Sequence, residues 1–341
     1  MELYGQSLTR NEVCKRVGDI SQIAGVKKYE FTEGRAKGVS AYEIYTASGL
    51  RFTVLPDRGL DIAFAEYNGI NFSWLGNTGV VSPALYDANG AAWLRNFFGG
   101  LLTTCGSQNI GSACTDNGKA YGLHGRLSNT PAEEVWAKTE WEGDELVIRV
   151  GGKVREVSVF GENMTLIREI KAYAGGTRFE LHDVLRNDGF SDSETLMLYH
   201  CNYGFPLLDK NTVMFKSEGK IIPRDAMAKD IELCTSFDAP QHGYDEQVFM
   251  HDMVADENGK TFAGLFNKAL GFGVKMSFLK EQFPLLVEWK MIGESEYVVG
   301  LEPATYAPLG RESARKDNAF TVLKPGEERH FDLTFEIVKS I

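Results

Sequence analysis

The sequence predicts a mostly β protein, a large antiparallel β-sandwich with few short helices. Segments of alternating apolar and polar residues recur about every ten residues, and glycine turns join many of them. This spacing is typical of antiparallel sheets that pack face to face. The chain lacks the alternation of strands and helices that a doubly wound or TIM-barrel fold requires. Its 341 residues, 43% of them hydrophobic, suffice for one large domain with a sizeable core.

The first predicted strands, residues 41–47 and 50–55, flank a tight turn at Ser48-Gly49. Further strands are predicted at residues 144–150, 153–160, 164–173, 177–187, 193–203, 262–267, 271–279, 284–291, 296–302 and 330–338. The predicted turns in the central series are Gly151-Gly152, Gly161-Glu162-Asn163 and Gly175-Gly176.

Helical signal is restricted to residues 7–18 and 91–98. Because no linker rich in proline or serine divides the chain, we expect a single domain over residues 1–341. Residues 1–30 are predicted to form a helical or extended lead-in to this domain.

Charge and composition exclude several classes of protein. A formal net charge of −11 disfavours nucleic-acid binding, which needs a basic surface. The chain contains no run of about 18 apolar residues, so no membrane-spanning helix is predicted. The first residues lack the pattern of a secretory signal, and the five cysteines have no C-x-x-C spacing. Reduced thiols and a cytoplasmic location are therefore expected.

His200 is the first candidate for acid–base chemistry. In a strand over residues 193–203, Leu196, Leu198, His200 and Asn202 share one face, which becomes polar toward Gly204. That change is expected of a strand that leaves the core and enters a cleft. A buried histidine hydrogen-bonded to a neighbour is the alternative.

His124 and Glu302 are the other two candidates. Glycines on both sides of Leu123-His124 permit unusual backbone angles and close approach of a ligand, although a solvated turn would look the same. Gly300 shares a face with Glu302 and leaves space beside it. A partly desolvated carboxylate has a raised pKa and is a better base at neutral pH, whereas a surface strand end is the alternative.

Polar residues near aromatic ones suggest a polyhydroxylated ligand. Arg58 lies in a charged turn, and Arg95 lies between Trp93 and Phe97. Further candidates to face a site are Asp245, Glu246, Gln247 and His251. The alternatives are that the aromatic residues belong to the core and that the charged run is solvated.

Six short motifs follow one another along the chain: Pro56–Gly59, Gly99–Gly106, Leu123–Arg126, Tyr199–Leu208, Glu246–Val248 and Leu301–Pro303. Each is weak alone, but six in order are specific, and together they span nearly the whole chain. In this respect the chain resembles a poorly characterised branch of the aldose 1-epimerase (galactose mutarotase)-like superfamily. The resemblance implies the galactose mutarotase-like supersandwich, with a cleft across one face of a large sheet.

The resemblance also implies an isomerase that interconverts the anomers of a sugar without cofactor or metal. Glu302 would remove the proton from the anomeric hydroxyl, His200 would protonate the ring oxygen, and His124 would bind the sugar or assist the acid. The predicted substrate-binding residues are Arg58, Arg95, Arg126, Asn202, Asp245, Glu246 and Gln247. The expected partner is a small-molecule carbohydrate; the oligomeric state stays open, with a homodimer as one option.

The chain departs from ordinary mutarotases around these residues. It has Tyr121 in place of an asparagine, Arg126 in place of a glycine, and Ala304 in place of a glutamine. Cys201-Asn202-Tyr203 replaces a Tyr-Phe-Asn run. Arg126, with Arg58 or Arg95, would favour a sugar that carries a carboxylate, phosphate or sulfonate.

Two other functions remain open from the sequence. One is an isomerase, epimerase or lyase that acts on a modified sugar in the same cleft. A metal held by His124, His200 and Glu246 or Glu302 would suit it, although no close-spaced ligand motif is present. The other is a carbohydrate-binding protein without catalysis.

Overall fold

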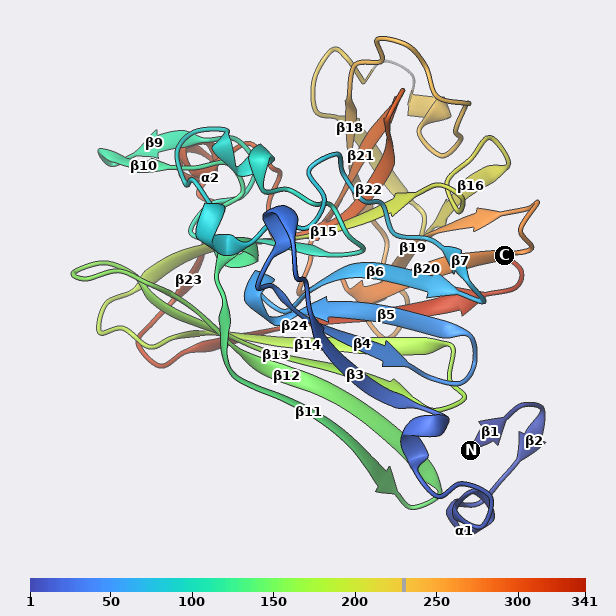
Figure 1. The fold of residues 1–341 in the computed structure, drawn as a ribbon. Helices are drawn as coiled ribbons and strands as arrows, with labels where there is room; N and C mark the ends of the chain where they lie inside the picture. Colours follow the sequence, from blue (N-terminus) through green and yellow to red (C-terminus); the bar gives the residue numbers. More distant parts are fainter. Residues whose placement is uncertain (229–230) are drawn as a thin grey trace.

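Three antiparallel sheets account for most of the computed structural model, which describes residues 1–228 and 231–341 (Figure 1). The eight-stranded sheet has the order β11 (Ala132–Glu142), β12 (Glu145–Val157), β13 (Asn163–Tyr173), β14 (Arg178–Asn187), β24 (Glu328–Val338), β20 (Phe272–Leu279), β19 (Lys260–Asn267) and β16 (Thr212–Lys216). The seven-stranded sheet contains β17 (Gly219–Pro223), β18 (Gln247–Met253), β21 (Leu285–Gly293), β22 (Glu296–Ala304), β15 (Ser193–Gly204) and β23 (Thr321–Leu323), and β8 (Thr103–Ser107) also pairs with β15. The five-stranded sheet contains β3 (Gly25–Glu30), β4 (Ser40–Tyr45), β5 (Leu50–Leu55), β6 (Asp61–Tyr67) and β7 (Ile70–Asn71). The predicted mostly β, antiparallel architecture is confirmed.

Helices are short, as predicted. The expected helix at residues 7–18 is reduced to α1 (Arg10–Cys14), and that at 91–98 to a 3-10 turn at Ala92–Arg95. The sequence pattern did not indicate α2 (Arg311–Lys316). Two small hairpins lie outside the three large sheets, β1 (Glu2–Leu3) with β2 (Gln6–Ser7) and β9 (Cys114–Asp116) with β10 (Lys119–Tyr121). Among the described residues, neither α-helix is long and apolar enough to cross a membrane. A single domain over residues 1–341 stays a prediction.

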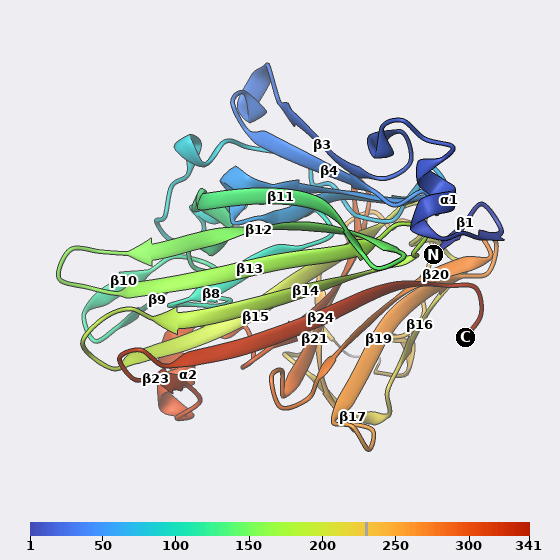
Figure 2. The same ribbon diagram turned by 90° about the horizontal axis from the view of Figure 1, so that it is seen from below.

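Aromatic side chains join the sheets into one core. The ring of Phe52 on β5 stacks on Phe179 of β14 with centroids 4.3 Å apart, and Phe179 stacks on Phe335 of β24 at 4.8 Å. Figure 2 shows β3 and β4 lying next to β11, the edge strand of the eight-stranded sheet. Stacked, fully buried rings of this kind hold two sheets face to face.

A buried ion-pair network lies beneath β15. Arg168 on β13 donates to Asp61 of β6 at 2.9 Å and to both carboxylate oxygens of Asp183 on β14. The hydroxyl of Tyr199 on β15 donates to Asp183 at 2.6 Å, and Thr104 on β8 donates to Asp61. Because these groups come from all three sheets, the network fixes the position of β15 from its core side. The opposite side of β15 carries His200.

The turn predicted at Gly151-Gly152 is wrong, since β12 runs unbroken through both residues. A Cβ on Gly151 would lie 2.5 Å from the ring of Trp136, which packs over this strand from β11. The register of β11 against β12 shifts between Glu133 and Trp136. Glycine here allows a neighbouring side chain to lie close to the strand rather than a reversal of the chain.

Candidate functional site

His200 faces a cleft from the middle of β15, as alternation along the strand predicts. Tyr199 and Cys201 point into the main core, whereas Leu198 and His200 point to the other side. The imidazole is only 5% exposed. Its ring lies between aromatic neighbours, with centroids 5.1 Å from Phe97 and 5.3 Å from Trp289.

Glu302 lies beside His200 because β15 and β22 are antiparallel neighbours (Figure 1). Leu198 pairs with Ala304 and Cys201 with Leu301, which brings His200 and Glu302 opposite each other on one face. His200 Nε2 lies 3.1 Å from Glu302 Oε1.

Gly300 provides the space that the carboxylate occupies. A Cβ at Gly300 would lie 2.4 Å from Glu302 Oε1 and 3.3 Å from His200 Cε1. A side chain at this position would therefore displace the carboxylate, which is itself 2% exposed. The space predicted beside Glu302 is present and is filled by Glu302 itself.

Burial determines the protonation of this pair. It raises the pKa of Glu302 well above its ordinary value of 4.5, and the nearby charge of Glu246 acts in the same direction. It lowers the pKa of His200 well below 6.5, and His124 adds to this effect. Both shifts favour neutral forms, because a charge is poorly solvated in this site. The pair therefore favours its neutral state, which holds one proton in total.

His124 completes the polar wall of the cleft from the loop before Gly125. It adopts a left-handed backbone conformation with φ of 57°. Its Nδ1 accepts from the backbone N–H of Gly111 at 3.3 Å, so the neutral ring carries its hydrogen on Nε2. Burial lowers the pKa of His124 to about 4. The His124 and His200 ring centroids are 5.6 Å apart.

The cleft has a volume of about 260 Å³. It is lined by Trp93, Leu94, Phe97, Gly111, Ser112, Leu123, His124, His200, Arg224, Glu246, Val248, Val287, Trp289, Glu302 and Pro308. An apolar, aromatic wall with a few convergent polar groups is the usual composition of a small-molecule site.

Arg224 and Trp289 are cleft residues that sequence reasoning missed. Glu246 accepts from Arg224 Nη2 at 2.9 Å and from Trp289 Nε1 at 2.8 Å. Arg224 also donates to Asp225 at 2.7 Å. Period-two alternation in β21 puts Val287 and Trp289 on one face, but only the fold shows that this face lines the cleft.

Arg58 lies away from the cleft and is fully buried. Its guanidinium donates to the backbone carbonyls of Ser128, Val81 and Asn96. With these three bonds made inside the protein, Arg58 is not available to a ligand. The predicted role in substrate binding is not supported, and the residue instead holds three chain segments together.

Five other predicted binding residues also lie outside the lining of the cleft. Arg95, Arg126 and Asp245 are exposed, and Gln247 lies on β18 opposite Lys290. Asn202 is buried and donates to the backbone carbonyls of Gly100 and His200. Of the predicted substrate-binding residues, only Glu246 joins His124, His200 and Glu302 in the cleft.

Known proteins share this architecture. A family model described as "Domain of unknown function (DUF4432)" matches residues 36–337. The chain belongs to this family. No match is found among curated proteins.

The crystal structure of a protein named "putative aldose 1-epimerase" from Klebsiella pneumoniae has a TM-score of 0.88 at 30% identity, covering 92% of this chain and 83% of that one. A galactose mutarotase-like protein from Clostridium acetobutylicum has a TM-score of 0.64 at 16% identity, covering 94% of this chain and 100% of its own. Galactose 1-epimerase from Lactobacillus acidophilus has a TM-score of 0.57 at 12% identity, covering 93% of this chain and 99% of its own. The last two show the fold alone. The resemblance to this superfamily, and the galactose mutarotase-like fold, are confirmed.

Proposed function

We propose that this protein is a sugar isomerase of the aldose 1-epimerase type, which interconverts the α and β anomers of a reducing sugar. The observation that carries the proposal is the buried His200–Glu302 pair, 3.1 Å apart in an aromatic cleft. Anomer interconversion requires one proton donor and one proton acceptor beside the same carbon atom. The mutarotase-like fold and the name of the 30% identical neighbour agree with this chemistry.

The short distance within the pair suits the geometry of the reaction. The anomeric hydroxyl and the ring oxygen are both bonded to C1, so two adjacent groups reach both. Glu302 removes the proton from the hydroxyl while the C1–O5 bond breaks and His200 donates a proton to O5. The open-chain aldehyde rotates about C1–C2, and closure in reverse gives the other anomer.

Ring closure is ring opening in reverse, so each group acts once as acid and once as base. The reaction therefore requires that the pair hold one proton in total. Burial keeps it in that state, as the opposite shifts of the two pKa values indicate. The carboxylate–imidazolium form and the neutral form differ only in the position of this proton. His124, with hydrogen on Nε2, is proposed to bind a sugar oxygen.

The charges in the cleft favour a neutral sugar. Among the described residues that line it, Arg224 is the only lysine or arginine, and it already pairs with Glu246 and Asp225. Arg126 is exposed and outside the lining, so its position gives no support to the prediction of an acidic substrate. Trp93, Phe97 and Trp289 offer apolar faces to a pyranose ring.

The test is NMR exchange spectroscopy, which measures anomer interconversion, on a panel of neutral aldoses and uronic acids. Loss of one general acid–base group costs about 10²–10⁴-fold in rate, so Glu302→Gln and His200→Asn should each lose kcat to this extent with little change in KM. His182→Asn is a matched control, because His182 also pairs with a carboxylate, Asp332, but on the eight-stranded sheet. It should behave as the parent.

Normal turnover in folded Glu302→Gln or His200→Asn would remove the proposed mechanism. The non-catalytic alternative predicts a different result. The parent would then show no exchange with any sugar of the panel, while sugar affinity, measured by calorimetry, would be equal in the parent and in His200→Asn.

A further inference from the structure

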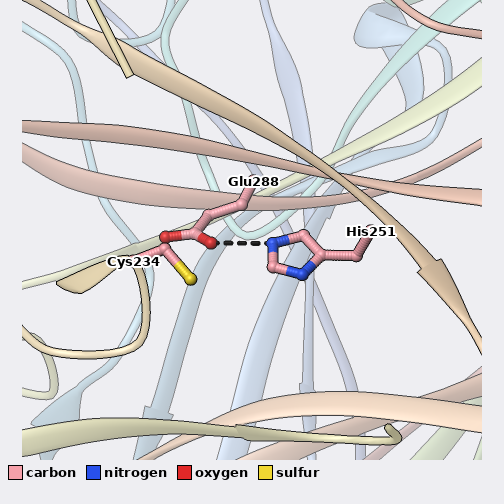
Figure 3. A group of neighbouring side chains, drawn as sticks. All are labelled: Cys234, His251 and Glu288. Carbon is pink, nitrogen blue, oxygen red and sulfur yellow. Dashed lines mark hydrogen bonds and ion pairs between the residues drawn. The ribbon is translucent and has the colours of Figure 1, made fainter. Parts of the chain in front are cut away.

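Three side chains with metal-binding chemistry converge behind the wall of the cleft. They are Cys234, which follows a 3-10 turn at Ile231–Leu233, His251 on β18 and Glu288 on β21 (Figure 3). Their ligand atoms all lie within 4.8 Å of one another, and all three residues are buried. We name them the back-face cluster. Among the described residues, this is the only group of three or more His, Cys, Asp or Glu that converges in this way.

The pairing of β18 with β21 shows that the back-face cluster and the cleft lie on opposite faces of the sheet. Phe249 pairs with Glu288, and alternation along the strands puts Val287 and Trp289 on the cleft side. Phe249 packs instead with Cys234, on the other side of the sheet. The sheet therefore lies between the back-face cluster and the His200–Glu302 pair.

The cluster contains polar atoms that the protein does not satisfy. His251 Nε2 lies 2.8 Å from Glu288 Oε2, but Glu288 Oε1 and His251 Nδ1 have no hydrogen-bond partner in the chain. Both residues are 0% exposed. A buried carboxylate with an unpaired oxygen is costly unless it is paired or binds a metal. The hydrogen bond between His251 and Glu288 does not remove this cost, because Glu288 Oε1 stays unpaired.

We propose that Cys234, His251 and Glu288 bind one divalent metal ion of the Zn²⁺ type, which has a structural role. Thiolate, imidazole and carboxylate are the three ligand types that Zn²⁺ takes in proteins. The three residues would supply three of four tetrahedral positions and leave the fourth to water or a backbone carbonyl.

His251 and Glu288 need little movement to admit the ion. With metal–nitrogen and metal–oxygen distances of about 2.1 Å, tetrahedral ligand atoms lie about 3.4 Å apart. His251 Nε2 and Glu288 Oε2 would therefore separate by roughly 0.6 Å from their present distance of 2.8 Å. Rotation of the two side chains is sufficient for a shift of this size, and the strands need not move.

The charges are compatible with a divalent ion. Cys234 thiolate and Glu288 carboxylate together carry two negative charges, which balance the metal, while His251 is neutral. Binding would release the thiol proton, and affinity should rise with pH.

The ion would fasten the segment that carries Cys234 to the back of β18 and β21. Lys290 on β21 already donates to the carbonyls of Leu233 and Ser236, on either side of Cys234. The cleft sides of the same strands carry Val248 and Trp289. The proposed role is therefore to stabilise one wall of the cleft without contact with the substrate.

The test measures metal directly, independently of any sugar chemistry. Purified protein is stripped with a chelator, titrated with Zn²⁺ or Co²⁺, and analysed for bound metal by mass spectrometry. We expect one ion per chain and, with Co²⁺, a near-ultraviolet thiolate-to-metal charge-transfer band. Cys234→Ser should lose the band and at least tenfold in affinity. Cys14→Ser, which changes an exposed cysteine on α1, is the matched control and should keep both.

His251→Gln provides a second variant if Cys234→Ser does not fold, and it should also weaken binding at least tenfold. Added Zn²⁺ should raise the Tm of the parent and of Cys14→Ser but not of folded Cys234→Ser. Failure of the stripped parent to bind either ion stoichiometrically overturns the proposal. A charge-transfer band that persists in Cys234→Ser also overturns the proposal, because another cysteine would then be the ligand.

Discussion

Replacement of Gly300 by alanine tests the His200–Glu302 pair without removing either group. The added Cβ would lie 2.4 Å from Glu302 Oε1, where ordinary contact begins at 3.4 Å. The carboxylate must therefore move by about 1 Å, away from its position 3.1 Å from His200 Nε2. Such a misplacement of a reacting group costs about 100-fold in rate. We expect kcat/KM of Gly300→Ala to fall by this factor.

The effect on stability should be much smaller. Crowding a packed site costs about 1–3 kcal/mol, whereas replacing a strand glycine with alanine gains about 0.5–1 kcal/mol. The net loss is therefore about 1 kcal/mol, which leaves a typical domain folded. Activity and stability should thus separate in this variant, since unfolding cannot account for the lost rate.

Anomer exchange by NMR gives the rate, and urea unfolding gives the stability. Gly293→Ala is a matched control in β21, the strand next to β22. Its added Cβ meets the mobile end of Met291 at 2.9 Å. It should retain kcat/KM within about threefold, since no reacting group is displaced. If folded Gly300→Ala were as active as Gly293→Ala, the carboxylate position would be irrelevant and the mechanism would be wrong.

Three further outcomes follow from the same geometry. The lowered pKa of His200 sets the acid limb of the pH–rate profile and the raised pKa of Glu302 sets the alkaline limb. The acid limb should therefore lie well below pH 6.5 and the alkaline limb well above pH 4.5. An acid limb at pH 6.5 or an alkaline limb at pH 4.5 would contradict this. In Arg58→Lys, the lysine cannot reach all three carbonyls that Arg58 contacts. The free energy of unfolding, measured by urea titration, should therefore drop by about 1–3 kcal/mol while KM is unchanged. A raised KM would instead restore Arg58 as a binding residue. Arg224→Ala removes a charged hydrogen bond from Glu246 at the cleft, so KM should rise about tenfold with a smaller change in kcat. Unaltered sugar kinetics would place Arg224 outside the binding site.

Local patterns predicted the parts of the site that depend on one or two strands. Alternation along β15 correctly put His200 on the face opposite Tyr199, because side chains in a strand point to alternate sides. The space at Gly300 beside Glu302 was predicted from the same rule. The same local reasoning was wrong at Gly151, where a ring from a neighbouring strand, and not a turn, explains the glycine.

The residues that were missed or misplaced depend on contacts between distant segments. Arg58 and Asn202 were predicted to face a ligand but donate to backbone carbonyls. Arg224 enters the cleft because it pairs with Glu246, 22 positions away. Nothing in the sequence near these residues distinguishes a side chain that holds the backbone from one that faces a ligand.

The sequence by itself determined the fold class, the superfamily and the side of β15 on which His200 lies, because these follow from periodicity, turns and ordered motifs. Only the tertiary structure decided that His200 and Glu302 touch, that both are desolvated and that Cys234, His251 and Glu288 meet behind them. The physical reason is that burial and close approach arise from the pairing of strands far apart in the chain. Both the pKa values and the ligand geometry depend on that pairing.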